Sequence, residues 1–197
     1  MAFYRRPLPH LDEPERSVFL TWRLRGSLPP HRPFPATLSS GQAFVAMDRL
    51  LDQTRAGPFY LRQPALADMV VEAIHYGDTV LGHYALHAFV VMPNHVHLLI
   101  TPAVALCTLT KPLKGITAKR ANAMLALTGS SFWQDESYDH LVRQADEFDK
   151  IRNYIEENPV RAGLAATASE YKWSSAGGAT GGSPADQGVC PTIARQP

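Results

Sequence analysis

Two apolar segments near the middle of the chain, separated by Pro93-Asn94, constrain the fold most. His83 to Met92 and His95 to Thr101 are rich in β-branched and aliphatic residues, and each has the length of one strand. Proline and asparagine are typical turn residues. We therefore predict two strands joined at Pro93-Asn94, which places a sheet at the centre of the molecule.

The remaining elements follow from hydrophobic spacing and from the positions of proline and glycine. A first strand is expected at Ser17 to Leu24, and a short one around His140 to Arg143. Helices are expected where apolar residues recur at helical spacing. One helix is expected to begin at Ser39 or Ser40, with apolar positions Phe44, Met47, Leu50 and Leu51. A second should begin at Pro64, with apolar positions Leu66, Met69, Val70 and Ile74. A third should run from about Leu106 to Leu127, and a fourth from Ala145 to about Glu157, where Pro159 stops the helix.

This order of elements predicts an α+β sandwich. It is the ferredoxin-like order β-α-β-β-α-β, with an antiparallel sheet and an additional C-terminal helix that carries Tyr154. The 197 residues fit one domain at 1–175, which begins with a basic N-terminal arm at 1–16. Residues 176–197 are rich in glycine, proline and alanine, so we expect a flexible tail.

Composition argues against several classes of protein. Cys107 and Cys190 lie outside any Cys-x-x-Cys pattern, so a disulfide framework or a cysteine-rich zinc finger is not expected. The chain has neither an apolar run of about 18 residues nor a signal-peptide core, so we expect no membrane partner and a cytoplasmic location. Basic residues cluster in the first 33 positions and between Thr101 and Gln134, where no acid occurs. Such clusters indicate either phosphate binding or a solvated surface.

His95-Val96-His97 is the first group able to support chemistry. Residues two apart in a strand point to the same face, with Cα atoms roughly 6–7 Å apart. His95 and His97 would therefore present two imidazoles to one ion, while Val96 faces the other side. Taken alone, the pattern is better explained by surface or hydrogen-bonded histidines.

Tyr154 and Asn158 form the second group. They are four residues apart on the expected last helix, so they share a face beside its apolar stripe. A tyrosine hydroxyl can act as a covalent nucleophile, and an amide oxygen can bind Mg²⁺ or Mn²⁺. The plainer alternative is a core aromatic beside an asparagine that caps the helix ahead of proline.

Together these blocks resemble the HUH-type transposases, in particular the REP-associated tyrosine transposases. The similarity rests on Ala88 to His97, Asn153 to Gly163 and Tyr171 to Ser175. Shorter matching blocks lie at Leu113 to Ala118, Phe132 to Gln134 and Ser137 to His140. The resemblance spans about residues 15 to 175.

The resemblance implies an enzyme that cleaves and rejoins single-stranded or hairpin DNA of the REP type through a 5′-phosphotyrosine intermediate. Tyr154 would be the nucleophile, and His95, His97 and Asn158 would bind a divalent metal, Mg²⁺ or Mn²⁺. The protein would act as a monomer or a homodimer. Nucleic-acid contacts are expected from the basic clusters and the aromatic loop: Arg5, Arg6, Lys111, Lys114, Lys119, Arg120, Phe132 and Trp133.

The same residues were compared with three other classes of protein: a nucleotide hydrolase, a structural adaptor and a nucleic-acid-binding protein without catalysis. A packed aromatic loop explains Phe132 and Trp133 at least as well as base stacking does. A histidine-triad nucleotide hydrolase would need a third histidine where Leu99 stands. A structural adaptor explains neither the histidine pair nor the basic helix. A catalytically silent protein that binds hairpin DNA or RNA is therefore the main alternative.

Overall fold

The computed structural model describes residues 16–28 and 40–177. Arg5, Arg6 and most of the expected arm lie outside the described residues, as does the tail from residue 178 onward. Within the described ranges, no helix is both long and apolar enough to cross a membrane.

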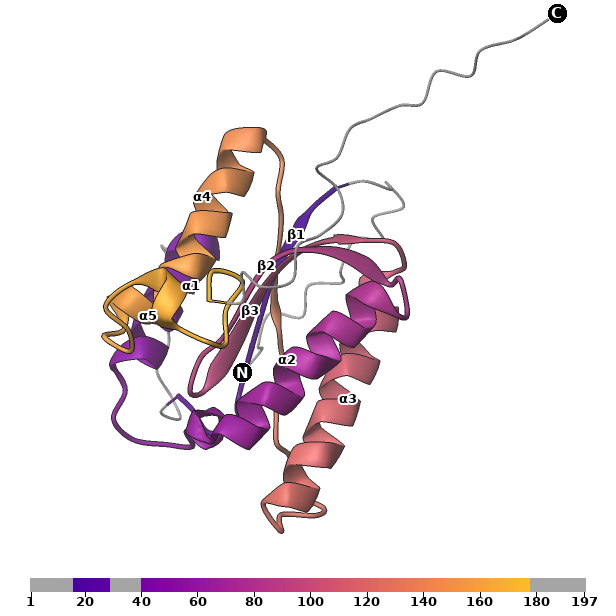
Figure 1. Ribbon diagram of the computed structural model, residues 1–197, viewed down its shortest axis with the longest axis vertical. Coiled ribbons are helices and arrows are strands. Elements are labelled where there is room, and N and C mark those ends of the chain that lie inside the picture. The colour runs from indigo at the N-terminus through magenta and orange to yellow at the C-terminus, as the bar shows by residue number, and fades with distance from the viewer. Residues whose placement is uncertain (1–15, 29–39, 178–197) are drawn as a thin grey trace, which may run out of the picture.

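A four-stranded antiparallel sheet forms the centre of the protein (Figure 1). Its strands run in the order β2-β3-β1-β4, which is the ferredoxin-like arrangement, so the predicted fold class is confirmed. The Pro93-Asn94 turn joins β2 to β3, and Met92 N–H donates to the His95 carbonyl at 2.9 Å. The strands are β1 Val18–Arg23, β2 Tyr84–Val91, β3 His95–Pro102 and β4 Tyr138–Leu141.

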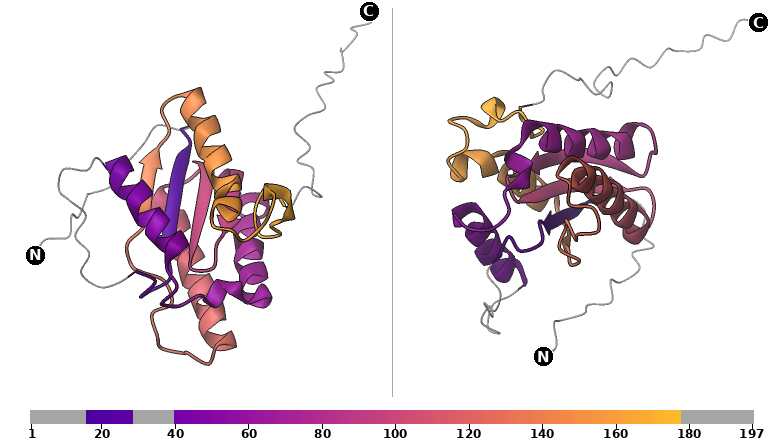
Figure 2. Two further views of the ribbon diagram at one scale, coloured as in Figure 1. Left: turned by 90° about the vertical axis from the view of Figure 1, so that its left-hand side faces the viewer. Right: turned by 90° about the horizontal axis from the view of Figure 1, so that it is seen from below.

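Helices cover both faces of this sheet. Figure 1 shows α2 and α3 on one face and α1 and α4 on the other, and the left view of Figure 2 shows α1 and α4 crossing the same face. The helices are α1 Ser40–Gln53, α2 Pro64–Thr79, α3 Leu106–Met124, α4 Ala145–Glu156 and α5 Asn158–Arg161, with 3₁₀ turns at Tyr60–Arg62 and Ala168–Glu170.

Strand alternation divides the side chains of β3 between two hydrophobic cores. Val96, Leu98 and Ile100 join the core under α2 and α3. Leu99 joins the second core, under α1 and α4. Because His95 and His97 have the same parity as Leu99, they face α1 and α4 from the middle of the sheet.

Three predicted boundaries were inaccurate. β4 begins two residues earlier than expected, because Tyr138 already pairs with Thr21 of β1. α3 ends at Met124 rather than near Leu127. Pro159 does not stop helical structure. It lies in the first turn of α5, where its missing N–H is tolerated.

Trp173 to Ser175 lie along the edge of the sheet and tie the end of the described chain to the domain. The Val91 N–H donates to the Trp173 carbonyl at 2.8 Å, and the Ser175 N–H donates to the Phe89 carbonyl at 2.9 Å. An open edge strand can pair with other chains. We call residues 173–175 the edge segment, since they cover part of the free edge of β2.

Candidate functional site

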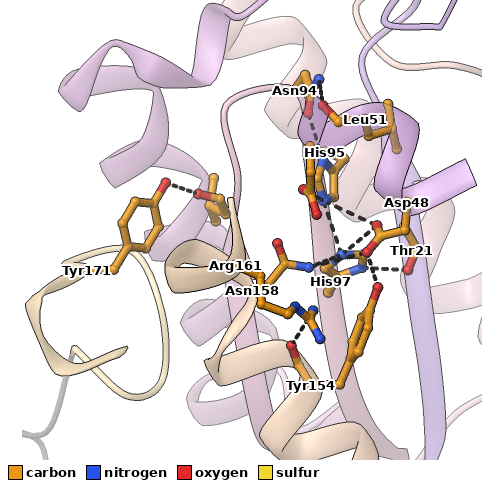
Figure 3. A network of polar contacts seen from close by, with 12 residues as sticks. Thr21, Asp48, Leu51, Asn94, His95, His97, Tyr154, Asn158, Arg161 and Tyr171 are labelled. Atoms are coloured by element: carbon orange, nitrogen blue, oxygen red, sulfur yellow. Dashed lines mark hydrogen bonds and ion pairs between the residues drawn. The ribbon is translucent and has the colours of Figure 1, made fainter. Parts of the chain in front are cut away.

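His95 and His97 meet on the face of β3 that is covered by α1 and α4 (Figure 3). Both side chains are 0% exposed, and their Nε2 atoms lie 3.1 Å apart. Two lone pairs at this distance repel each other unless a proton or a cation lies between them. The prediction that the two imidazoles lie on the same face of the strand is confirmed.

Neighbouring side chains fix the orientation of both rings. Thr21 of β1 places Oγ1 2.7 Å from His97 Nδ1. Asn94 Nδ2 donates to the Leu51 carbonyl at 3.0 Å, so Asn94 Oδ1 is the acceptor for His95 Nδ1–H at 2.7 Å. This bond leaves the lone pair of His95 on Nε2, which points into the site.

Asp48 of α1 completes the site, and it was not among the predicted site residues. Its side chain is 1% exposed, and Oδ1 lies 3.1 Å from His97 Nε2 and 3.5 Å from His95 Nε2. Its Oδ2 accepts hydrogen bonds from the Tyr154 hydroxyl and from Asn158 Nδ2, the latter at 3.3 Å. One carboxylate thus contacts the histidine pair and the tyrosine.

Tyr154 and Asn158 reach the site from two helices, α4 and α5, rather than from one helix as predicted, and both side chains contact Asp48. Asn158 is fully buried, with Nδ2 3.2 Å from His97 Nε2. The Arg161 guanidinium carbon lies 3.9 Å from the centroid of the Tyr154 ring, and Nη2 donates to the Tyr154 carbonyl at 3.0 Å. Arg161 is the exposed cation of the site. Its only signal in the sequence was its place in the block that ends at Gly163.

Burial and mutual contact shift the pKa values of the site. Burial opposes ionisation of Asp48, but the imidazoles of His97 and His95 and the hydrogen bond from Tyr154 outweigh it, so the pKa of Asp48 lies well below its usual value. Burial, followed by the charge of Asp48, raises the pKa of Tyr154 and raises that of Asp52 to about 7. Burial also lowers the pKa of His95, which keeps this ring in the neutral form that binds metals.

The donor atoms fit a divalent cation. One ligand atom from each of Asp48, His95 and His97 lies within 4.8 Å of the other two. Ligands held ~2.0–2.2 Å from one ion lie roughly 3–3.5 Å apart, close to the separations of these three residues. Asp48 Oδ1 and Asn158 Oδ1 are also buried without hydrogen-bond partners, which is costly unless a ligand uses them.

The predicted basic residues of α3 do not converge on this site. Lys114 Nζ donates to the Gln134 carbonyl at 2.8 Å and to the Asp135 carbonyl at 3.0 Å, and burial lowers its pKa. It therefore ties the following loop to α3. Arg120 pairs with Glu72 of α2 at 2.7 Å. Lys111 and Lys119 are exposed.

Phe132 and Trp133 are packed side chains. They are 4% and 5% exposed and belong to the core under α2 and α3. Trp133 Nε1 donates to Thr117 Oγ1 at 2.9 Å. Burial at this level leaves neither ring a free face for a base, so the arrangement found is the packed aromatic loop rather than a stacking surface.

Comparison with known proteins identifies related families and folds. Residues 72–158 match the family model described as "Transposase IS200 like". The solved structure of a REP-associated tyrosine transposase bound to a REP hairpin shares the fold, with 18% identity, a TM-score of 0.57, and coverage of 99% of this chain and 100% of that one. A candidate transposase from Deinococcus radiodurans R1 is 20% identical over 80% of this chain and 98% of that chain, with a TM-score of 0.37. No curated protein matches. The matched range contains both histidines, Tyr154 and Asn158, but not Asp48.

Proposed function

We propose that this chain is a strand transferase that cleaves and rejoins single-stranded DNA, because residues 72–158 match the model of the IS200-like transposase family. The observation that carries the proposal is the part-buried contact of the Tyr154 hydroxyl with Asp48, which also contacts His95 and His97. A nucleophile next to a group of metal ligands is the arrangement that phosphoryl transfer to a protein side chain needs.

Tyr154 is the proposed nucleophile. Its Oη attacks phosphorus, the bond from phosphorus to the 3′ oxygen breaks, and the 5′ phosphate remains on the tyrosine. The 3′ oxygen takes up a proton and leaves as a free 3′-OH. Asp48 Oδ2 already accepts a hydrogen bond from the hydroxyl, so it is placed to take the proton as the new bond forms. A second 3′-OH then attacks the phosphotyrosine and releases Tyr154, which regains a proton, so no external energy source is required.

His95, His97 and Asp48 are the proposed ligands of a divalent cation, Mg²⁺ or Mn²⁺, with Asn158 beside them. When bound, the cation polarises the scissile phosphate as a Lewis acid. Thr21 and Asn94 hold the two imidazoles in place. Arg161, against the Tyr154 ring, is the proposed donor to the phosphoryl oxygens.

Hairpin DNA of the REP type is the proposed substrate. Support comes from the shared fold with a transposase that is bound to a REP hairpin. Arg5, Arg6, Lys111 and Lys119 remain proposed backbone contacts, since neutralising phosphates supplies most of the affinity of such proteins.

The test is covalent capture of labelled DNA. The full chain is incubated with Mn²⁺ and 3′-labelled single strands that contain the palindromes flanking its own gene. Label should move to protein size on a denaturing gel. Tyr154→Phe and a chelator should each abolish the adduct, whereas Tyr76→Phe, at an exposed tyrosine of α2, should retain it. Tight hairpin binding without an adduct would instead support the binding-only alternative.

A further inference from the structure

Asp52 is a largely buried carboxylate next to the candidate site, and the proposed function gives it no role. It lies on α1 four residues after Asp48, so the two side chains share one face of that helix. Its Oδ1 lies 4.0 Å from His95 Nε2, and its side chain is 14% exposed. Asp52 therefore borders the group formed by Asp48, His95 and His97.

The position of Asp52 is costly for a carboxylate. Its Oδ1 is buried and has no hydrogen-bond partner among the described residues. Burial lowers the pKa of His95, so the ring next to Asp52 is neutral and supplies no opposite charge. Asp48 adds a like charge one turn away, and Asp52 also lies in the last turn of α1, where the helix dipole disfavours anions. A cation close by would offset these costs.

Asp52 is placed to reach such a cation through a water. It is not among the three residues whose ligand atoms all lie within 4.8 Å of one another. Opposite ligands of an octahedral Mg²⁺ are only roughly 4.2 Å apart, so Asp52 falls outside the set that can bind the ion directly. A carboxylate at this remove accepts a hydrogen bond from a water that the ion binds.

The number of donor atoms at the site makes such a water depend on the metal. Asp48, His95 and His97 offer one ligand atom each, and Asn158 Oδ1 is buried without a hydrogen-bond partner. Four protein donors complete the tetrahedral shell that Zn²⁺ prefers. Mg²⁺ and Mn²⁺ take six ligands in octahedral geometry, so at this site they keep waters.

We propose that Asp52 is a positioning residue that makes the site selective for Mg²⁺ and Mn²⁺ over Zn²⁺. Its Oδ1 accepts a hydrogen bond from a water bound to the cation, and only an ion that keeps its waters gains from this bond. The inference rests on the cation site of the proposed function, but its test does not depend on DNA cleavage.

The test measures metal binding. Mn²⁺ is titrated into the full chain at about pH 8, where a carboxyl with a pKa of about 7 is ionised, and free Mn²⁺ is followed by electron paramagnetic resonance. Zn²⁺ is then added to displace Mn²⁺, which gives the ratio of the two affinities at one site. Asp52→Asn should weaken Mn²⁺ binding roughly tenfold, as expected when a group that holds a metal's ligand in place is lost. It should leave Zn²⁺ binding nearly unchanged.

The Tm of the metal-free chain gives a second readout. Replacing a residue that only supports the fold lowers the Tm. Asp52→Asn should instead raise the Tm by roughly 2–4 °C, because an uncompensated charge next to Asp48 is removed. Asp52→Leu has no side-chain acceptor and should show both effects, so the result does not depend on the amide of asparagine. Asp149→Asn, at an exposed carboxylate of α4, is the matched control and should change neither quantity.

The outcomes separate this inference from the proposed function. Unchanged Mn²⁺ affinity in both Asp52 variants, or an equal loss of Mn²⁺ and Zn²⁺ binding with a lower Tm, would overturn the role of Asp52 even if a Tyr154 adduct forms. A selective loss of Mn²⁺ binding, with no adduct on any palindrome, would support Asp52 and refute the strand transferase. An unsubstituted chain that binds no Mn²⁺ would refute the cation site and the role of Asp52 together.

Discussion

At the scale of single residues, the shared carboxylate of Asp48 organises the site. Its Oδ1 contacts the Nε2 atoms of His95 and His97, and its Oδ2 accepts the hydrogen bond of Tyr154. The groups proposed to bind metal and to attack phosphorus therefore meet at one side chain. Removing its charge should affect both.

Asp48→Asn keeps the shape of the side chain and removes its charge. We expect the affinity for Mn²⁺ to fall at least about tenfold, because even residues that only support a ligand change affinity by about 10–100-fold. Electron paramagnetic resonance of free Mn²⁺ measures this directly. Asp149→Asn, at an exposed carboxylate of α4, is the matched control and should bind normally. Unchanged Mn²⁺ affinity in Asp48→Asn would remove this carboxylate from the ligand set.

The sequence predicted those site residues whose relation depends on one strand or one helical face. The two-residue spacing of His95 and His97 fixes a shared face of β3. The four-residue spacing of Tyr154 and Asn158 predicted that they lie close together, although the structure places them on two helices, α4 and α5. Asp48 is different, because its partners depend on how α1 packs on a distant strand. One signal was present: Asp48 interrupts the apolar stripe between Phe44 and Leu51, where a buried carboxylate needs a partner.

At the scale of elements, local spacing predicted each strand and the longer helices, and errors arose where tertiary pairing set the boundary. The start of β4 depends on Thr21 of β1, which pairs with Tyr138. α5 begins at Asn158, whose side chain is buried 3.2 Å from His97 Nε2 of the distant strand β3. Neither the start of β4 nor the start of α5 can be predicted from the residues that neighbour it in the sequence.

The edge segment provides a test at this scale. A chain that ends at Lys172 loses the backbone bonds of Trp173 and Ser175 to β2, and also the bond from Trp173 Nε1 to Asp68 Oδ1 at 2.9 Å. We expect the free energy of unfolding to fall by about 2–4 kcal/mol, since each hydrogen bond contributes about 1 kcal/mol and the Trp173 packing is lost as well.

Urea denaturation measures that difference. The control is a chain that ends at Gly177, which retains every described contact of the edge segment and should unfold like the full chain. Equal midpoints for the two truncated chains would show that residues 173–177 contribute nothing to stability.

At the scale of the whole molecule, the site joins parts that are far apart in sequence. α1 provides Asp48, β3 provides His95 and His97, and α4 and α5 provide Tyr154 and Asn158. A cation bound by Asp48, His95 and His97 would therefore link α1 to the sheet. Binding to the folded chain alone must raise its stability.

Mn²⁺ at about one hundred times its dissociation constant should add about 2.7 kcal/mol to the free energy of unfolding. For a chain of this size the Tm should rise roughly 5–10 °C. Differential scanning calorimetry measures the shift. His97→Leu should remove the response to Mn²⁺, whatever its Tm without metal. An equal shift in this variant would locate the Mn²⁺ elsewhere.

The two faces of β3 carry residues with different roles, so substitutions on the two faces have different consequences in evolution. Val96, Leu98 and Ile100 belong to the core under α2 and α3, so substitutions at these positions lower the free energy of unfolding. His95 and His97 lie on the opposite face, so a single substitution there would remove the proposed metal site without changing a residue of that core. If the proposed function is correct, a lineage of such chains can therefore lose catalysis in one step while Val96, Leu98 and Ile100 stay in place.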